Sequence, residues 1–169
     1  KLRACNVTTV TDASISSIHD NFLETNDAKT IPADLVIWST GAAAPALLQN
    51  LNLEIDSRGF LLTHPTLQSI TNPHVFAVGD SGTIQSSPTP KAGVYAVRQG
   101  PILWENLQRG LSSVPLVDYR PQQSFLQLLN TGDGTAIGQW KGISLSSRWL
   151  MSLKHSIDSK FMKMYEPML

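Results

Sequence analysis

The sequence predicts an α/β fold, and three observations support this prediction. Residues 35–38 form a short, continuous apolar run, which is typical of a strand buried on both faces of a parallel sheet. Residues 75–80 begin as an apolar strand, end in Gly-Asp, and are followed by a loop and then by a helical stretch over residues 91–109. Residues 148–165 carry apolar side chains at the three- and four-residue spacing of an amphipathic helix.

The composition indicates a folded protein that does not bind nucleic acid. Hydrophobic residues make up 41% and charged residues 15% of the 169 residues, which is enough apolar side chain for a packed core. The net charge is zero, but residues 1–80 carry 4 Lys and Arg against 8 acids, whereas residues 81–169 carry 9 against 5. Lys and Arg form no dense stripe, so we expect no nucleic-acid partner.

The first part of the chain has the alternation of half-buried strands. Apolar side chains alternate with Thr, Ser and Asn over residues 7–18. A hairpin is expected over residues 22–31, with Asn26-Asp27 in its turn. Residues 42–51 are small and apolar, and Pro45 is placed to begin a helix in its first turn.

The middle of the chain predicts two strands and a long helix. The strands are expected over residues 60–62 and 75–78, with a turn at residues 71–73 between them. Residues 81–90 are rich in Ser, Thr, Gly and Pro and predict a loop. Pro101 lies inside the helical stretch that follows, so we expect a bend there.

The last part predicts a small α+β region that ends in the amphipathic helix. Residues 112–121 hold two prolines and read as a connector. Apolar stretches over 125–129 and 135–140 flank Asn-Thr-Gly-Asp-Gly, which is typical of a hairpin, and residues 143–145 predict a third strand.

The Gly79-Asp80 pair is the first candidate for chemistry. Glycine lets the backbone turn sharply and come close to a ligand. Asp80 would then follow the carboxyl end of a strand, where α/β folds bind cofactors, and its carboxylate can accept hydrogen bonds from two adjacent hydroxyls. The pair alone favours an ordinary turn, because such pairs are common in loops.

Two segments together change this interpretation. Residues 75–80, VFAVGD, resemble the second FAD motif of the pyridine nucleotide-disulfide oxidoreductase superfamily of two-dinucleotide flavoproteins. Residues 33–41, ADLVIWSTG, resemble the segment that closes the NAD(P)H domain of that family, with Ser39 where alanine is more usual. The resemblance implies a partial two-dinucleotide-binding fold, in which Asp80 binds a ribitol hydroxyl of FAD while Thr40 and Gly41 shape the crossover near the cofactors.

The following helix adds to the resemblance. Residues 91–100, KAGVYAVRQG, resemble the family helix whose N-terminus points at the pyrimidine edge of the flavin. A helix N-terminus offers free N–H groups and a positive dipole end, which suit the negative charge of reduced flavin. The resemblance implies cofactor contacts from Lys91 and the backbone of Ala92 and Gly93, and it places Gln99 on the acceptor side. In the alternative reading, Lys91 is a solvated surface residue and the glycine is a packing contact.

The family resemblance also implies a domain division. Residues 1–41 would end an NAD(P)H-binding domain, residues 42–111 would be the C-terminal part of an FAD-binding domain, and residues 112–169 would form a small α+β cap. The sequence contains neither G-x-G-x-x-G loop of the family and no redox-active cysteine pair. We therefore expect the C-terminal fragment of a longer FAD-dependent NAD(P)H oxidoreductase, inactive alone, whose N-terminal half completes both cofactor sites and whose acceptor is not a disulfide.

The last third leaves three readings of the function open. It resembles the end of the oxidoreductase region joined to selenide, water dikinase in some bacteria, and more loosely the C-terminal region of type II NADH:quinone oxidoreductases, where an amphipathic helix rests on the membrane. The chain is then a reductase, a non-catalytic assembly module linked to a dikinase or a twin subunit, or a peripheral membrane quinone reductase. We favour a final helix that packs on its own domain or in a homodimer.

The single cysteine, Cys5, favours a reducing compartment, and we expect a cytoplasmic protein. It cannot form an internal disulfide or a cysteine zinc site. His19, His74 and His155 share no metal-ligand spacing with it, so we expect no metal. No run of about 20 apolar residues is present to span a bilayer.

Overall fold

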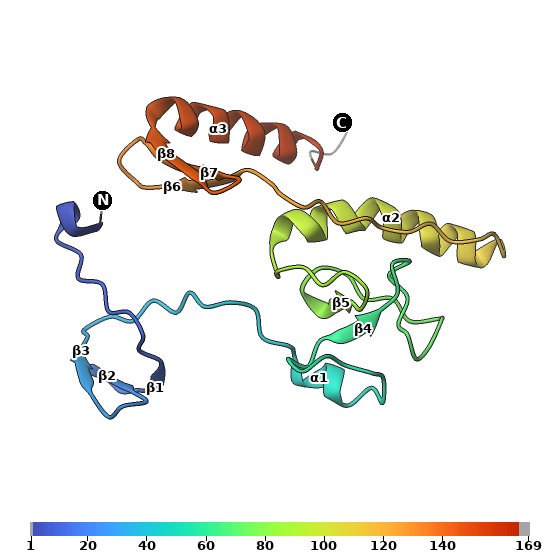
Figure 1. Cartoon of the computed structure of the whole chain (residues 1–169), viewed down its shortest axis with the longest axis horizontal. Helices are drawn as coiled ribbons and strands as arrows, with labels where there is room; N and C mark the ends of the chain where they lie inside the picture. Colours follow the sequence, from blue (N-terminus) through green and yellow to red (C-terminus); the bar gives the residue numbers. More distant parts are fainter. Residues whose placement is uncertain (1, 166–169) are drawn as a thin grey trace. The chain divides into compact units, whose positions relative to one another are not determined.

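The computed structural model describes residues 2–165, which form two compact units that divide between Ala42 and Ala43. Figure 1 shows the order of the elements along the chain. Unit 1 contains a 3₁₀ helix, η1 (Leu2–Cys5), and three strands. Unit 2 contains the remaining five strands, a second 3₁₀ helix and three α-helices of the described chain.

Unit 1 is built on a three-stranded antiparallel sheet. The strands are β1 (Ile15–Ile18), β2 (Phe22–Thr25) and β3 (Thr30–Pro32), in the order β1-β2-β3. The turn between β2 and β3 contains Asn26 and Asp27, and the Ala28 N–H donates to the Thr25 carbonyl at 2.9 Å. The predicted hairpin is therefore confirmed, because its short polar turn specifies it locally.

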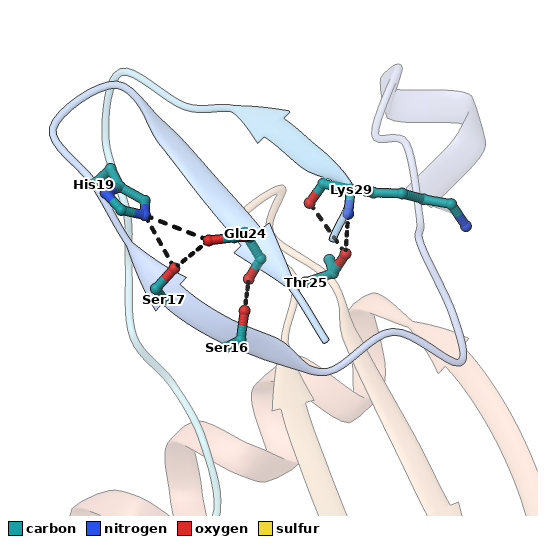
Figure 2. A network of polar contacts seen from close by, with 6 residues as sticks. All are labelled: Ser16, Ser17, His19, Glu24, Thr25 and Lys29. Atoms are coloured by element: carbon teal, nitrogen blue, oxygen red, sulfur yellow. Dashed lines mark hydrogen bonds and ion pairs between the residues drawn. The ribbon is translucent and has the colours of Figure 1, made fainter. Parts of the chain in front are cut away.

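Side chains on the sheet of unit 1 form a polar network, shown in Figure 2. The Ser17 hydroxyl donates to Glu24 Oε2 at 3.0 Å and lies 3.0 Å from His19 Nε2. At the β2–β3 turn, the Lys29 N–H donates to Thr25 Oγ1, and this hydroxyl lies 3.1 Å from the Lys29 carbonyl. These contacts link neighbouring positions of the hairpins and hold the turn in place.

Two strand predictions in unit 1 are wrong. Val7 and Val10 are 44% and 62% exposed, and no strand forms over residues 7–10 of the described chain. The run over residues 35–38 is extended without a strand in the described chain, and its Ile37 is 83% exposed. A strand buried on both faces needs hydrogen-bonded neighbours, and no described strand pairs with this run.

Unit 2 begins with a short helix and a parallel pair of strands. Helix α1 (Ala46–Gln49) is shorter than the predicted 42–51, and Pro45 is its N-cap, one position before the first turn. Strands β4 (Leu61–Thr63) and β5 (Gly82–Ile84) pair in parallel. The strand predicted over 60–62 is confirmed, whereas the loop predicted over 81–90 contains β5.

The close approach of Gly82 explains the unexpected strand. A Cβ at this position would lie 2.6 Å from the Ala77 carbonyl oxygen, so only glycine fits without a backbone shift. The Gly, Ser and Thr composition of this stretch is typical of a loop. The predicted loop was therefore wrong over β5, because the approach to residue 77 depends on tertiary packing.

The strand predicted over residues 75–78 is also wrong. The segment is extended but makes only an isolated bridge between Phe76 and Gln68, and the Ala77 N–H donates to the Leu67 carbonyl at 3.0 Å. Leu67 has a φ of +69°, which interrupts a regular ladder on the opposite side. The apolar side chains of this segment are nevertheless packed, because successive residues contribute to two different cores.

The two cores lie on either side of this extended segment. Ala77 packs with the buried Leu48 and Leu61 in the first core. Phe76 and Val78 pack against the second core, whose buried side chains are Leu67, Ile84 and Tyr119. The segment that carries the Gly-Asp motif is therefore fixed by packing on both sides.

Helix α2 (Gly93–Leu111) is the predicted long helix, with Pro101 inside it. The expected bend there stays a prediction. The buried Asn106 side chain donates to the carbonyls of Thr66 and Val117, both at 2.9 Å, and accepts from the Val117 N–H at 2.8 Å. It thus fastens the predicted connector, which has no regular element between residues 114 and 126, to the helix.

The C-terminal region forms a meander covered by a helix. Strands β6 (Gln127–Asn130), β7 (Ala136–Trp140) and β8 (Ile143–Ser147) form an antiparallel sheet, and α3 (Arg148–Lys163) packs on it. The Ser147 hydroxyl caps α3 by accepting the Leu150 N–H at 3.1 Å. The predicted hairpin, third strand and amphipathic helix are confirmed. Within residues 2–165, no helix has both the length and the apolar character to cross a bilayer.

Candidate functional site

The Gly-Asp motif forms a tight turn, the 3₁₀ helix η2 (Gly79–Ser81). Gly79 has a φ of +58°, and a Cβ on it would lie 3.0 Å from Ala96 Cβ in α2. The Gly79 N–H donates to Gln99 Oε1 at 2.5 Å. Gly79 therefore allows both the turn and its close contact with α2, and Gln99 holds that contact.

Asp80 is the exposed residue of this turn. Within residues 2–165, no hydrogen bond or ion pair of its carboxylate is found with another side chain or with the backbone. The chain places a carboxylate with free acceptor positions after an extended segment that is packed on both sides. Such a group can accept two hydrogen bonds from a ligand with adjacent hydroxyls.

The N-terminus of α2 is open. Ala92 is the N-cap in an extended conformation, and no described side chain caps the helix. A Cβ on Gly93 would meet no described atom within 4 Å. First-turn N–H groups and the positive end of the helix dipole thus face accessible space, which suits an anionic or electron-rich ligand edge.

Lys91 does not point its ammonium into that space. Its Nζ donates to the Gly82 carbonyl at 2.5 Å and to Thr83 Oγ1 at 3.1 Å. The same Nζ lies 4.1 Å from the centroid of the fully buried Phe60 ring. Lys91 therefore ties the start of α2 to β5.

Asp56 completes this cluster, and sequence reasoning missed it. Asp56 Oδ2 accepts the Thr83 hydroxyl at 2.7 Å, and Oδ1 accepts the N–H groups of Arg58 and Phe60 at 2.8 and 3.0 Å. Asp-Ser-Arg-Gly at residues 56–59 is a turn signal that could have indicated the local bonds. No local signal points to Thr83 or Lys91.

The cluster shifts the pKa of both charged groups downward. Burial lowers the pKa of the Lys91 ammonium, and the negative charges of Asp56 and Asp80 offset part of this effect. Burial by itself would raise the pKa of Asp56. Hydrogen bonds from Thr83 and from two backbone amides, together with the positive charge of Lys91, outweigh it and lower that pKa.

The predicted site residues are only partly brought together. Gly79 and Gln99 are in contact, Asp80 acts electrostatically on Lys91, and Ala92 and Gly93 begin the same helix. Gln99 is 4% exposed and engaged with Gly79, so the structure gives it a positioning contact. Thr40 and Gly41 are exposed residues of unit 1. The cofactor roles of all these residues, and the acceptor-side role of Gln99, stay predictions.

An apolar groove of about 840 Å³ begins at the start of α2. It is lined by Ala92, Gly93 and Val94, by residues 125–128, and by Ile157 of α3 with its neighbours Lys154 and Asp158. Lys154 and Asp158 form an ion pair of 2.6 Å at its side. The groove therefore joins the open helix N-terminus to the C-terminal cap.

The Ser17, His19 and Glu24 network in Figure 2 is a contrasting case. These residue types suggest a hydrolytic triad, but both Ser17 and Glu24 approach the same ring atom, His19 Nε2, at 3.0 and 3.7 Å. A triad needs the two ring nitrogens to contact different partners. We assign the network to the stability of the hairpin. Residues 2–165 also hold no group of three potential metal-binding side chains.

Comparison with known proteins gives one family. The model of the pyridine nucleotide-disulphide oxidoreductase family matches residues 1–100. The chain is 31% identical over 144 residues to demethylphylloquinone reductase NdbB of Synechocystis sp., and this match covers 82% of this chain and 34% of that protein. It is 34% identical over 74 residues to the type II NADH:quinone oxidoreductase of Haemophilus influenzae, covering 43% of this chain and 17% of that protein.

Solved structures show the same fold. A NAD-dependent persulfide reductase from A. fulgidus superposes with a TM-score of 0.59 at 21% identity, over 82% of this chain and 26% of that chain. The reduced CoADR-RHD protein of Bacillus anthracis superposes with a TM-score of 0.58 at 16% identity, over 82% of this chain and 25% of that one. The chain thus spans about a third or less of the proteins it matches.

Proposed function

The chain belongs to the pyridine nucleotide-disulphide oxidoreductase family, and on that premise we propose that it is the C-terminal part of an FAD-dependent NAD(P)H oxidoreductase. In this proposal hydride passes from NAD(P)H to the flavin, and electrons continue to an acceptor that is not a cysteine pair. An N-terminal half of the same polypeptide supplies the phosphate-binding loops. The division at residues 41 and 111 into parts of two cofactor domains and a cap belongs to the same proposal.

One observation carries the proposal: the Gly79 turn is pinned to α2, which holds the free Asp80 carboxylate near an uncapped helix N-terminus. The polar groups of this site fit FAD. A carboxylate suits the ribitol hydroxyls, and helix N–H groups suit the electron-rich pyrimidine edge of a reduced flavin. The open space at Gly93 leaves room for a planar ring. FAD supplies the redox chemistry, and these residues bind and orient it.

The test is the Asp80→Ala variant of the full-length protein. We expect its flavin-to-protein ratio after gel filtration to fall well below that of the wild type, because a charged hydrogen-bond acceptor is lost. Asp118→Ala, which removes another exposed carboxylate of unit 2, is the matched control and should keep the wild-type ratio. Equal occupancy in both variants contradicts the assignment, and a wild-type protein without flavin favours the non-catalytic assembly module.

We further propose a quinone as the electron acceptor. Both curated relatives named above are described as quinone reductases, and the apolar groove beginning at Ala92 and Gly93 suits a hydrophobic ring and tail. Ile157→Glu, which places a charge in the groove wall, should raise the KM for a short-chain quinone and leave reduction of the flavin by NAD(P)H unchanged. Ile143→Glu, outside the groove, is the control.

Contact of α3 with a membrane surface is a second candidate for this part of the chain. Trp149 and Met162 are 67% and 61% exposed on a helix whose last turn carries Lys160 and Lys163. This combination suits an interfacial helix. Liposome flotation of the full-length protein tests it: binding to anionic vesicles that is lost in Lys160→Glu/Lys163→Glu supports it. Absence of binding favours the cytoplasmic protein. Fusion to a dikinase and a homodimer stay predictions.

A further inference from the structure

The Lys91 side chain has two conceivable roles if the proposed flavin site is correct, and our inference rests on that function. Its charge could act directly on the cofactor, as the sequence suggested, or it could fix the position of the helix. We propose that Lys91 is a tether, which fastens the start of α2 to the turn that carries Asp80. Asp56 and Thr83 are then positioning residues that act through Lys91.

The first support is where the ammonium is held. Lys91 Nζ donates to the Gly82 carbonyl at 2.5 Å and lies 4.1 Å from the Phe60 ring centroid. Gly82 begins β5, directly after the turn of Gly79–Ser81, and it lies close to the Ala77 backbone, because a Cβ on it would be 2.6 Å from the Ala77 carbonyl oxygen. The contact of the Lys91 ammonium with Gly82 stabilises the position of Ala92, which follows Lys91 in the sequence and is the N-cap of α2.

The second support is a hydrogen-bond relay with a fixed direction. The Thr83 hydroxyl donates its one proton to Asp56 Oδ2 at 2.7 Å and accepts from Lys91 Nζ at 3.1 Å. A hydroxyl has one donor and can accept at the same time, so both bonds are satisfied together. Asp56 therefore orients Thr83, and Thr83 presents its lone pair to Lys91.

The third support is charge balance. The Asp56 carboxylate acts electrostatically on Lys91, and Asp80 does so as well, while Arg58 opposes them. The Phe60 side chain is fully buried, and its ring centroid lies 5.1 Å from the Arg58 guanidinium and 4.1 Å from Lys91 Nζ. The ammonium is thus held in a partly buried place where a carboxylate compensates its charge and an aromatic face adds attraction.

The two roles predict opposite changes in the flavin midpoint potential when the Asp56 charge is removed. If Lys91 acted directly on the cofactor, removing its charge would lower the flavin midpoint potential, and removing the Asp56 charge would raise it. If Lys91 is a tether, both losses loosen the α2 N-terminus. Both then weaken its stabilisation of the electron-rich reduced flavin, and both potentials fall. Loss of general stability alone would lower the melting temperature and leave the potential unchanged.

The experiment uses the full-length flavoprotein with Lys91→Met, Asp56→Asn and Thr83→Val. In Asp56→Asn, the amide oxygen can still accept the two backbone N–H bonds of the turn, so the local fold is kept. Thr83→Ser retains the hydroxyl and should restore wild-type behaviour. The matched controls are Lys29→Met and Asp27→Asn, which break an ion pair of 2.6 Å between exposed side chains in unit 1.

We expect all three disruptive variants to lower the midpoint potential and to raise the FAD dissociation constant about tenfold, the loss that a charge-assisted hydrogen bond supplies. Amide hydrogen exchange in the first turn of α2 should quicken in the same variants and not in the controls. A higher potential in Asp56→Asn, or failure of Thr83→Ser to restore the wild type, overturns the tether. A protein that binds no FAD refutes the proposed function instead, and the exchange measurement still tests the tether.

Discussion

The two units each carry one of the motifs that suggested the family, and the motif of unit 2 is held by a helix, whereas most of the motif of unit 1 is exposed. In unit 2, the Gly79 N–H bonds Gln99, and Lys91 bonds the Gly82 carbonyl. In unit 1, the motif over residues 33–41 is extended, and Leu35 and Ile37 are 79% and 83% exposed. The family match over residues 1–100 covers both motifs, whereas the local structure of each motif depends on neighbours elsewhere in the chain.

The largest difference between the units should come from alanine at two glycines. Gly82→Ala forces a methyl group to within 2.6 Å of the Ala77 carbonyl oxygen and should destabilise the protein by about 3 kcal/mol. Gly41→Ala meets no described atom within 4 Å and should change the free energy of unfolding by less than about 0.5 kcal/mol. Urea unfolding measures both. Equal effects would show that the packing of β5 against residue 77 is not tight.

The next effect concerns one buried polar side chain in each unit. Asn106→Ala leaves the Thr66 carbonyl and both backbone groups of Val117 without their partner, and it should cost about 2–3 kcal/mol. Thr25→Val removes hydrogen bonds to Asp27 and Lys29 in an exposed turn, where water can replace them, so about 1 kcal/mol is expected. Thermal unfolding compares the two. A larger loss for Thr25→Val contradicts this ranking.

The elements that the sequence predicted correctly are those set by local patterns. The hairpin that joins β6 and β7 turns over the predicted Asn-Thr-Gly-Asp-Gly stretch, in which Gly132 and Gly134 have positive φ, and α3 follows the spacing of its apolar residues. The strands expected over 35–38 and 75–78 failed because an apolar run needs paired neighbours to become a strand. The direction of the Lys91 side chain could not be predicted, because it depends on β5 and on Asp56, which lies far away in the sequence.

The two Asp–Lys pairs should both lose their contribution to stability in acid. The pKa of the exposed Asp27 is lowered by hydrogen bonds from Lys29 and Thr25. The pKa of Asp56 is lowered in its partly buried cluster with Thr83 and Lys91. A carboxyl group with a lowered pKa stabilises the folded state at pH values above its ordinary pKa of 3.8. This stability is lost as the pH falls through the lower pKa of the folded state. Both contributions should therefore disappear in strong acid.

Salt separates the two contributions. The attraction between exposed charges is screened at about 1 M salt, whereas the hydrogen bonds to Asp56 persist. We expect Asp56→Asn to reduce the stability at pH 6 to a similar extent in low and high salt, and Asp27→Asn to reduce it less in high salt than in low salt. Each variant is compared with the wild type by urea unfolding at pH 6, in low and in high salt. A salt-sensitive Asp56 contribution would mean that charge, rather than the relay through Thr83, dominates the cluster.

The smallest expected stability effect separates folding from ligand binding. Gly93 begins α2 without a positive φ and with open space around it, so Gly93→Ala should stabilise the protein by up to about 0.5 kcal/mol through helix propensity. The added methyl group would occupy the space that we assign to the flavin ring, so the same variant should bind FAD more weakly. Unfolding of the apo-protein and FAD titration measure the two effects. If stability rises and FAD affinity stays unchanged, the ring does not lie over Gly93, and the open N-terminus of α2 faces solvent in the full protein.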